Sequence, residues 1–271
     1  MPRIPTSVLR GLATVLSSPV MVVTTIGIVV AEWLALVAFG FEGPFSLVVN
    51  APGLPPVGTY TDLTLSISVF GVKTGFIALL GFVALRAMIL AVMTSMTVDA
   101  LQTGAASRWS VVRALRILPV TVAVNLVCLG LLVAANFIGP ILGAGFGLLI
   151  LMAALVGGVY LFGFAPTIGA TERRGMADIL GRSVRAGRTP GAGNLTFAAL
   201  YVVTAIALLA VPKPGSIIGV NPSIGAWVIA FLAGLGHVVV IATLAYRYLS
   251  VADEVPEAAP RREPASRAGR R

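Results

Sequence analysis

Four polar side chains stand out because each lies inside a long apolar run of the sequence. Glu32, Arg86 and His237 are ionisable, and Asn125 carries a neutral amide. An ionisable residue inside a membrane span costs about 2.5–3.5 kcal/mol on insertion scales, so it is by default a candidate for a functional site. Together the four could bind a polar substrate or relay a proton. The competing interpretation is that they join helices through hydrogen bonds worth about 0.6 kcal/mol each.

Glu32 and Arg86 have opposite charges, and we predict an ion pair between them. A helical rise of 1.5 Å per residue places all four polar residues about 13–21 Å below the outer ends of their predicted spans, near mid-membrane. The two charged groups belong to consecutive spans at similar depth, and pairing is the usual way in which charges persist inside a helical bundle. The neutral ring of His237 could instead bond to a backbone carbonyl.

The elements that must carry these residues follow from the composition. The chain has 271 residues, of which 58% are hydrophobic and 11% are charged, whereas about 25% is usual for a soluble domain. So few charges cannot cover a water-exposed surface, and we therefore predict an all-α, polytopic membrane protein. A spanning helix needs about 20 mostly apolar residues. Six runs qualify, at about residues 20–41, 74–98, 117–138, 141–165, 195–211 and 223–249.

Residues that start or stop helices support these boundaries. Gly139-Pro140 predicts a tight turn between the third and fourth spans, and Asn194 is placed to cap the start of the fifth. Asn221-Pro222 is placed to open the sixth. The first run is too long for the apolar region of a cleaved signal peptide, and Glu32 interrupts it, so we expect a retained helix.

The spans define one transmembrane domain, residues 1–250, followed by a tail. Residues 251–271 are rich in Pro, Ala, Arg and Glu and cannot bury a core, so we predict a disordered basic tail. The longest outer loop, residues 42–73, contains several Pro and Gly residues. It is either a plain connection or a lid over a ligand site.

The basic residues are distributed unequally between the two sides. With the N-terminus inside, sixteen of the nineteen fall on the inner side, Lys73 and Lys213 fall outside, and Arg86 lies within a span. This bias predicts a cytoplasmic-membrane protein with both termini in the cytoplasm. It also explains the net charge of +9 without nucleic acid. The basic cytoplasmic face can contact anionic lipid of the bilayer, and it is a candidate surface for a protein partner.

Short basic amphipathic segments precede the odd-numbered spans. They cover residues 7–12, 110–115 and 178–183. We therefore predict three hairpins, each introduced by a helix that lies on the cytoplasmic surface. Small residues at helical spacing, such as Gly139, Gly143 and Gly147, allow close helix packing within the chain or between two copies.

One segment between the fourth and fifth spans resembles a known pattern. It comprises residues 166–172, from Pro166 to Glu172, then Gly175, residues 179–183 with an Arg-Ser pair, and Gly187. The segment is similar to the corresponding stretch of prokaryotic six-helix membrane protein families of unknown function, including the membrane domain found in some glycerophosphodiester phosphodiesterases. The resemblance implies six helices. It implies no activity, because the soluble phosphodiesterase domain is absent from this chain.

The sequence offers little catalytic chemistry. With one histidine and one cysteine it lacks a usual zinc ligand set, and it has neither a nucleophile-elbow nor a Walker motif. Cys128, inside an apolar run, is best interpreted as a small buried residue. We predict no metal, no cofactor and no enzyme activity. The expected role is an envelope or scaffold component. The alternatives are a transporter or permease subunit with a mid-membrane polar site, and an intramembrane enzyme acting on lipid.

Overall fold

A computed structural model describes residues 2–38, 72–107, 109–142, 144–189, 191–210 and 224–256, and these ranges are all-helical. The predicted fold class, all-α, is confirmed. The short helices are α1 (Ile4–Leu16), α7 (Ala165–Thr171), α8 (Met176–Gly187) and the 3-10 turn η2 (Ala252–Glu254). The long helices are α2 (Pro19–Ala38), α4 (Val72–Thr103), α5 (Trp109–Leu142), α6 (Ala144–Phe162), α9 (Gly191–Ala210) and α10 (Ile224–Leu249).

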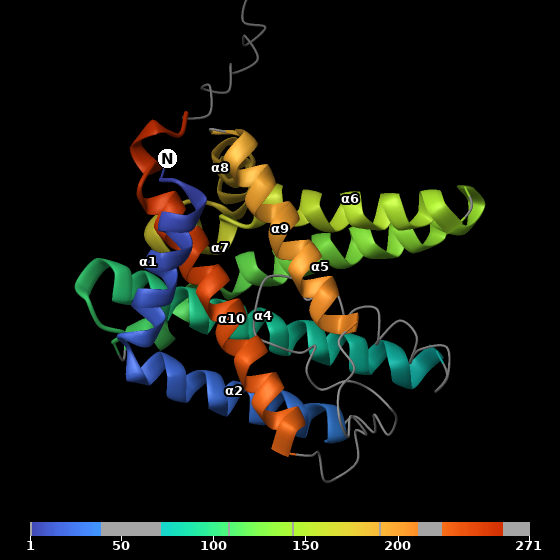
Figure 1. The fold of residues 1–271 in the computed structure, drawn as a ribbon, viewed down its shortest axis with the longest axis horizontal. Coiled ribbons are helices and arrows are strands. Elements are labelled where there is room, and N and C mark those ends of the chain that lie inside the picture. Colours follow the sequence, from blue (N-terminus) through green and yellow to red (C-terminus); the bar gives the residue numbers. More distant parts are fainter. Residues whose placement is uncertain are drawn as a thin grey trace, which may run out of the picture.

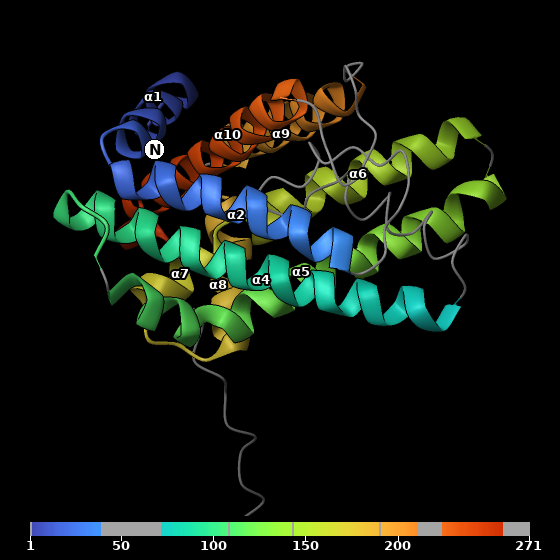
Figure 2. The same cartoon turned by 90° about the horizontal axis from the view of Figure 1, so that it is seen from below.

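The long helices run back and forth along one bundle (Figures 1 and 2). Helices α2, α5 and α9 run away from the end that holds the described N-terminus, and α4, α6 and α10 return to it. The short helices α1, α7 and α8 and the described C-terminal residues gather at that same end, which we call the terminal face. The chain therefore alternates direction from one long helix to the next.

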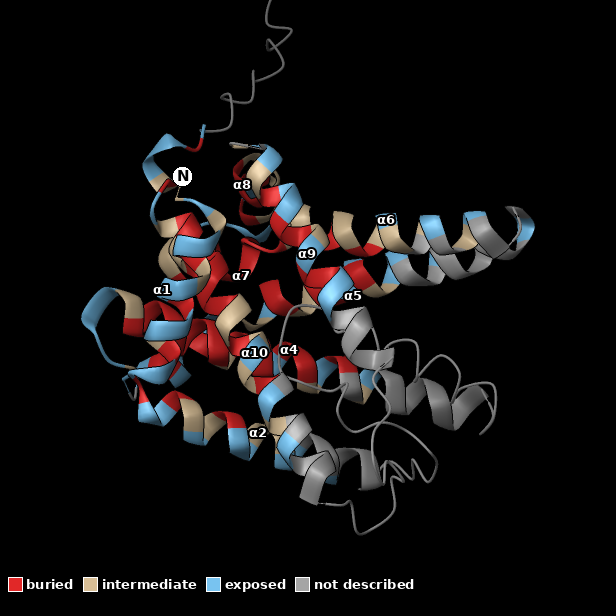
Figure 3. Ribbon diagram, viewed as in Figure 1, coloured by how far each residue is buried: buried red, intermediate tan, exposed pale blue. Residues whose placement is uncertain are grey.

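Helix α4 is the centre of the bundle. It packs against α5, α7 and α10, and also against α2, whereas α6 packs against α5 and α9. Its apolar window, Val83–Thr103, is 78% buried, against 39% for Trp109–Leu131 of α5. Figure 3 shows buried residues concentrated where α4, α7, α10 and the start of α5 meet. Large apolar side chains on the outer surfaces, such as Val23 and Leu149, remain exposed, as expected where lipid is the solvent.

Fewer helices pass a membrane-span test than the six predicted. Within the described residues, three are long and apolar enough: Val83–Thr103, Trp109–Leu131 and Met152–Thr171. The count rises to four if Ile4–Leu16 and Pro19–Ala31, which meet at 85°, form one span. The described parts of α9 and α10 are shorter apolar helices.

Three of the predicted local features differ from the structure, and two of them concern α5. Helix α5 continues through Gly139-Pro140 to Leu142, so the turn to α6 lies later than predicted. A proline so close to a helix end disturbs few backbone hydrogen bonds. Residues 110–115 are not a separate surface helix, because α5 starts at Trp109 and runs on without a break.

The other two amphipathic segments do form helices of their own, α1 and α8. The Asn221-Pro222 pair and most of the predicted outer loop lie outside the described residues.

The prediction that Asn194 caps the start of a helix is also wrong. Helix α9 starts earlier, at Gly191, and Asn194 is buried within it. The Asn194 side-chain amide donates to the carbonyl oxygens of Ala186 (3.2 Å) and Gly187 (3.0 Å). It therefore contributes donors to carbonyl groups at the C-terminal end of α8, where the helix itself supplies few.

Candidate functional site

A polar cluster occupies the middle of the bundle. Arg86 of α4 is 1% exposed. The hydroxyl of Tyr201 on α9 lies 2.8 Å from Nδ1 of His237 on α10, and the two rings meet edge-on at 5.5 Å. Helix α4, which carries Arg86, packs against α10, which carries His237. The structure thus places two of the predicted polar residues, Arg86 and His237, on neighbouring helices. It also adds Tyr201, which the sequence did not indicate, because a tyrosine in an apolar run is not a signal for a polar site.

The other two predicted residues are placed differently. Asn125 is buried in α5, and its amide donates to the carbonyl of Thr121 one turn earlier, at 2.8 Å. Glu32 belongs to α2, which packs against α4. Its side chain lies outside the described residues, so the ion pair with Arg86 stays a prediction.

Helix α4 also carries a strip of buried hydroxyl groups. Thr94, Ser95 and Thr97 are each at most 1% exposed. Within the described part of the chain, none of these three hydroxyls has a hydrogen-bond partner. Buried polar groups without protein partners are rare, and bound water or a ligand is a common reason for them. The strip lies between Arg86 and Asp99 along α4.

At the end of this strip, Asp99 holds the turn between α4 and α5. Its carboxylate accepts hydrogen bonds from the hydroxyls of Ser110 (2.5 Å) and Ser107 (3.2 Å). It also forms an ion pair with Arg113. These contacts are local in sequence and fix the angle at which α5 leaves α4.

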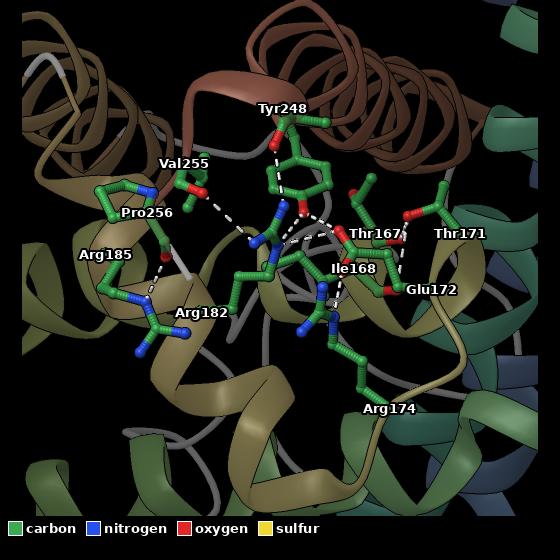
Figure 4. A network of polar contacts seen from close by, with 11 residues as sticks. Thr167, Ile168, Thr171, Glu172, Arg174, Arg182, Arg185, Tyr248, Val255 and Pro256 are labelled. Atoms are coloured by element: carbon green, nitrogen blue, oxygen red, sulfur yellow. Dashed lines mark hydrogen bonds and ion pairs between the residues drawn. The ribbon is translucent and has the colours of Figure 1, made fainter. Parts of the chain in front are cut away.

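The largest polar network lies at the terminal face and is centred on Arg182 of α8 (Figure 4). Arg182 is 5% exposed. Its Nε donates to Glu172 at 3.0 Å and to the Tyr248 hydroxyl at 2.9 Å. Its two terminal nitrogens donate to the backbone carbonyls of Ala252 (2.8 Å) and Val255 (3.4 Å). We call these five residues the Arg182 network.

Glu172 receives further donors within this network. The hydroxyl of Tyr248 donates to it, and so does Nε of Arg174 at 2.5 Å. Burial lowers the pKa of Arg182, but the bond to Tyr248 and the charge of Glu172 outweigh that effect and raise its pKa overall. Arg182 therefore keeps its positive charge, as arginine normally does in proteins.

Local packing explains why α8 can place Arg182 there. A Cβ atom on Gly187 would collide with the backbone carbonyl of Tyr160, so only glycine lets α8 approach α6 this closely. The hydroxyl of Ser183 donates to the carbonyl of Leu161 at 2.8 Å and fastens the same contact. Glu172 follows α7 directly, and its amide bonds to the carbonyl of Ile168.

The network joins parts of the chain that sequence reasoning treated separately. The resemblance singled out Glu172 and Arg182, although not as a site, and the structure places them in contact. Tyr248 and the carbonyls after α10 were missed. Residues 251–256, the start of the predicted disordered tail, pack against the bundle with Val251 and Val255 only 2% and 3% exposed. The four-residue spacing of these two valines was the sequence signal that this segment packs against the bundle. Residues 257–271 lie outside the described part.

A second network ties the N-terminal segment to the bundle. Arg247 of α10 is 1% exposed and donates to the Asn194 side-chain oxygen at 2.8 Å. It also donates to the hydroxyl of Ser7 (3.2 Å) and the carbonyl of Pro2 (3.1 Å). Both described ends of the chain are thus held at the terminal face by buried arginines.

Both networks join the chain to itself. Every donor described for Arg182 is directed at a carboxylate, a hydroxyl or a carbonyl of the chain itself. Within the described ranges, no group of three or more His, Cys, Asp or Glu residues is arranged to hold a metal ion. Comparison with protein-family models, with curated proteins and with solved structures finds no match. The resemblance noted from residues 166–187 therefore stays a prediction.

Proposed function

We propose that this chain is a six-span protein of the cytoplasmic membrane, with both termini in the cytoplasm, that acts as a non-enzymatic scaffold. The lengths of the long helices support six spans: α9 has 20 residues and α6 has 19, which correspond to about 30 Å at 1.5 Å per residue, the thickness of the hydrocarbon core. Their alternating directions support an even number of crossings.

The charge distribution supports the orientation. Sixteen basic and seven acidic residues belong to the side of the terminal face, so the whole net charge of +9 is on that side. The charges of the other side and of the bundle interior cancel. Trp109, 63% exposed at the start of α5, is the kind of residue that sits at the membrane–water interface. The terminal face is therefore the cytoplasmic face.

The Arg182 network is the observation that carries the scaffold role. It fixes residues 252–255 to α8 through two hydrogen bonds, from Arg182 to the backbone carbonyls of Ala252 and Val255. Beyond this anchor the chain continues into a tail with five arginines, at positions 261, 262, 267, 270 and 271. A basic segment that leaves from a rigid point favours a partner protein with an acidic surface, because complementary charge steers association.

A transport role is the second candidate, and the hydroxyl strip of α4 favours it. Thr94, Ser95 and Thr97 are buried hydroxyls that lie between Arg86 and Asp99 along α4. If water occupies this strip, a polar path runs from the cytoplasm to the Arg86–His237–Tyr201 cluster. A scaffold has no need of such a path.

Cysteine labelling separates the two roles. In a Cys128→Ser background we would introduce Thr94→Cys, which changes little in size, and treat inside-out vesicles with a water-soluble maleimide. Ala105→Cys, exposed in the turn after α4, is the positive control, and the fully buried Ala91→Cys is the negative control. Labelling of position 105 alone supports the scaffold. Labelling of position 94 at a rate near that of position 105 supports transport and rejects the scaffold.

The orientation has its own test in the same background. Ala105→Cys should react in inside-out vesicles only, and Gly58→Cys, in the predicted outer loop, should react from the outside of intact cells only. Reaction of both positions from one side would refute the six-span topology.

A further inference from the structure

An open pocket lies on the terminal face between three helix ends. It has a volume of about 410 Å³ and is formed by α1, the end of α4 and the end of α10. Its polar lining comes from Arg10 and Thr14 on α1 and from Tyr246 and Ser250 at the end of α10. The volume falls in the range of about 300–1,000 Å³ that small-molecule sites occupy. Neither the mid-bundle cluster nor the Arg182 network includes any of these four residues.

The chemistry of the lining suits an anion. The hydroxyls of Thr14 and Ser250 donate hydrogen bonds to the backbone carbonyls of Arg10 and Arg247, respectively. In contrast, the side chains of Arg10 and Tyr246 make no hydrogen bond or ion pair to any other described residue. No acidic residue lines the pocket. A guanidinium and a phenol hydroxyl are thus available as donors, and guanidinium groups bind phosphate with good geometry.

Helix α1, which forms one side of the pocket, has faces of different character. One of its faces, with Ser7, Gly11 and Val15, is buried against the bundle. Gly11 makes this possible, because a Cβ there would lie 2.6 Å from the Thr243 hydroxyl. A second face is apolar yet open, with Leu9 65% exposed and the remaining members Leu12 and Leu16 also exposed.

The third face of α1 carries the polar groups that line the pocket, Arg10 and Thr14. Helix α1 also turns by 85° from the direction of α2. A helix with an apolar face, a basic face and an orientation across the bundle axis is typical of one that lies in the membrane interface. The pocket therefore opens at the level of the lipid headgroups, next to side chains that would enter the acyl layer.

We propose that this pocket binds the headgroup of an anionic phospholipid, with Arg10 and Tyr246 donating to the phosphate. The inference rests on the proposed membrane orientation, in which the terminal face is cytoplasmic. The headgroup sits between α1 and α10, and its acyl chains lie along the exposed leucines of α1. A soluble phosphate would use the same two donors but would gain nothing from that apolar face, so the lipid is the ligand the geometry favours.

The test uses the full-length protein purified in detergent and titrated with dioleoyl phosphatidylglycerol, with lipid adducts counted by native mass spectrometry. Dioleoyl phosphatidylcholine is the comparison lipid, and glycerol 3-phosphate is the soluble competitor. The variants are Arg10→Gln and Tyr246→Phe. Arg3→Gln is the matched control, because Arg3 is an exposed arginine of the same segment that does not line the pocket.

We expect wild type and the Arg3 variant to bind one phosphatidylglycerol in preference to phosphatidylcholine. Arg10→Gln should weaken that binding about tenfold, equivalent to about 1.4 kcal/mol. Tyr246→Phe, which keeps the ring and so the packing, should weaken it by a smaller factor. An unchanged melting curve for each variant shows that the fold is intact.

Three results would overturn the proposal. They are equal binding of the two lipids, equal loss in the Arg3 and Arg10 variants, and full competition by glycerol 3-phosphate, which would make the ligand a soluble phosphate. None of these results bears on the six-span topology, which the labelling at positions 58 and 105 tests by itself. A failed lipid site and a failed orientation are therefore distinguishable.

Discussion

Replacing Arg182 with methionine is the sharpest test of the network at the terminal face. Methionine keeps most of the apolar volume of the side chain but removes the charge and the four hydrogen bonds described above. The carbonyls of Ala252 and Val255 then lose a donor in a buried setting. Among the described residues, Glu172 keeps the donors from Arg174 and Tyr248.

The size of the effect can be bounded from the burial of the partners. Removing one member of a buried ion pair costs about 3–5 kcal/mol. Glu172 retains 19% exposure and other donors, so the lower end of that range applies. We expect a loss of about 3 kcal/mol, which lowers the melting midpoint by about 6–12 °C at about 2–4 °C per kcal/mol for a chain of this size.

The assay is thermal unfolding in detergent, paired with hydrogen exchange of residues 251–256. Exchange should rise in this segment, because the Arg182 bonds hold it and because the amides of Val251 and Glu254 are hydrogen-bonded in place. Arg173→Met is the control, since Arg173 is an exposed arginine close to Glu172. Its substitution should cost no more than about 0.5 kcal/mol. Equal midpoints for the two variants, or unchanged exchange at 251–256, would refute the anchoring role.

Two further predictions concern packing and the interior charges. Gly187→Ala should lower the melting midpoint, because the added methyl meets the backbone carbonyl of Tyr160 and pushes α8 from α6; the matched control Gly181→Ala, whose Cβ would meet only the flexible end of Arg185 at 3.5 Å, should have little effect. For the predicted interior ion pair, Glu32→Gln and Arg86→Gln should each lower the midpoint and the double variant should recover part of the loss, since each single change leaves one charge without its counterion. Single variants that melt at or above wild type would instead indicate charges kept for function at a cost in stability.

The sequence alone determined the class of the protein and the course of its helices. Apolar runs and the low charge content are local properties, and a helix satisfies its backbone hydrogen bonds within its own segment. For this reason α1, α8 and the long helices appear where their patterns predicted, except that α5 starts about eight residues earlier and includes the predicted surface segment 110–115. The prediction that the basic residues gather on one side likewise uses the sequence alone, and it depends on the six predicted spans.

Local signals failed where a residue serves a neighbouring element. Asn194 has the chemistry of a helix cap and does cap a helix, but it caps α8 from within α9. Pro140 has the chemistry of a turn residue, yet it lies in the last turns of α5. In both cases the residue type predicted the kind of role, and the packing of the helices decided where in the chain that role is carried out.

Only the tertiary structure decided which polar groups meet. Arg182 and Tyr248 are 66 residues apart, and their contact depends on how α8 lies on α6 and on the side of α10 that faces inward. The meeting of Tyr201 with His237, and of Arg10 with Tyr246 around one pocket, depends on the same helix rotations. A helical sequence repeats its faces about every 3.6 residues, but which face contacts which neighbour is set by packing between distant segments. The sequence therefore determined the helices, and the packing decided the sites.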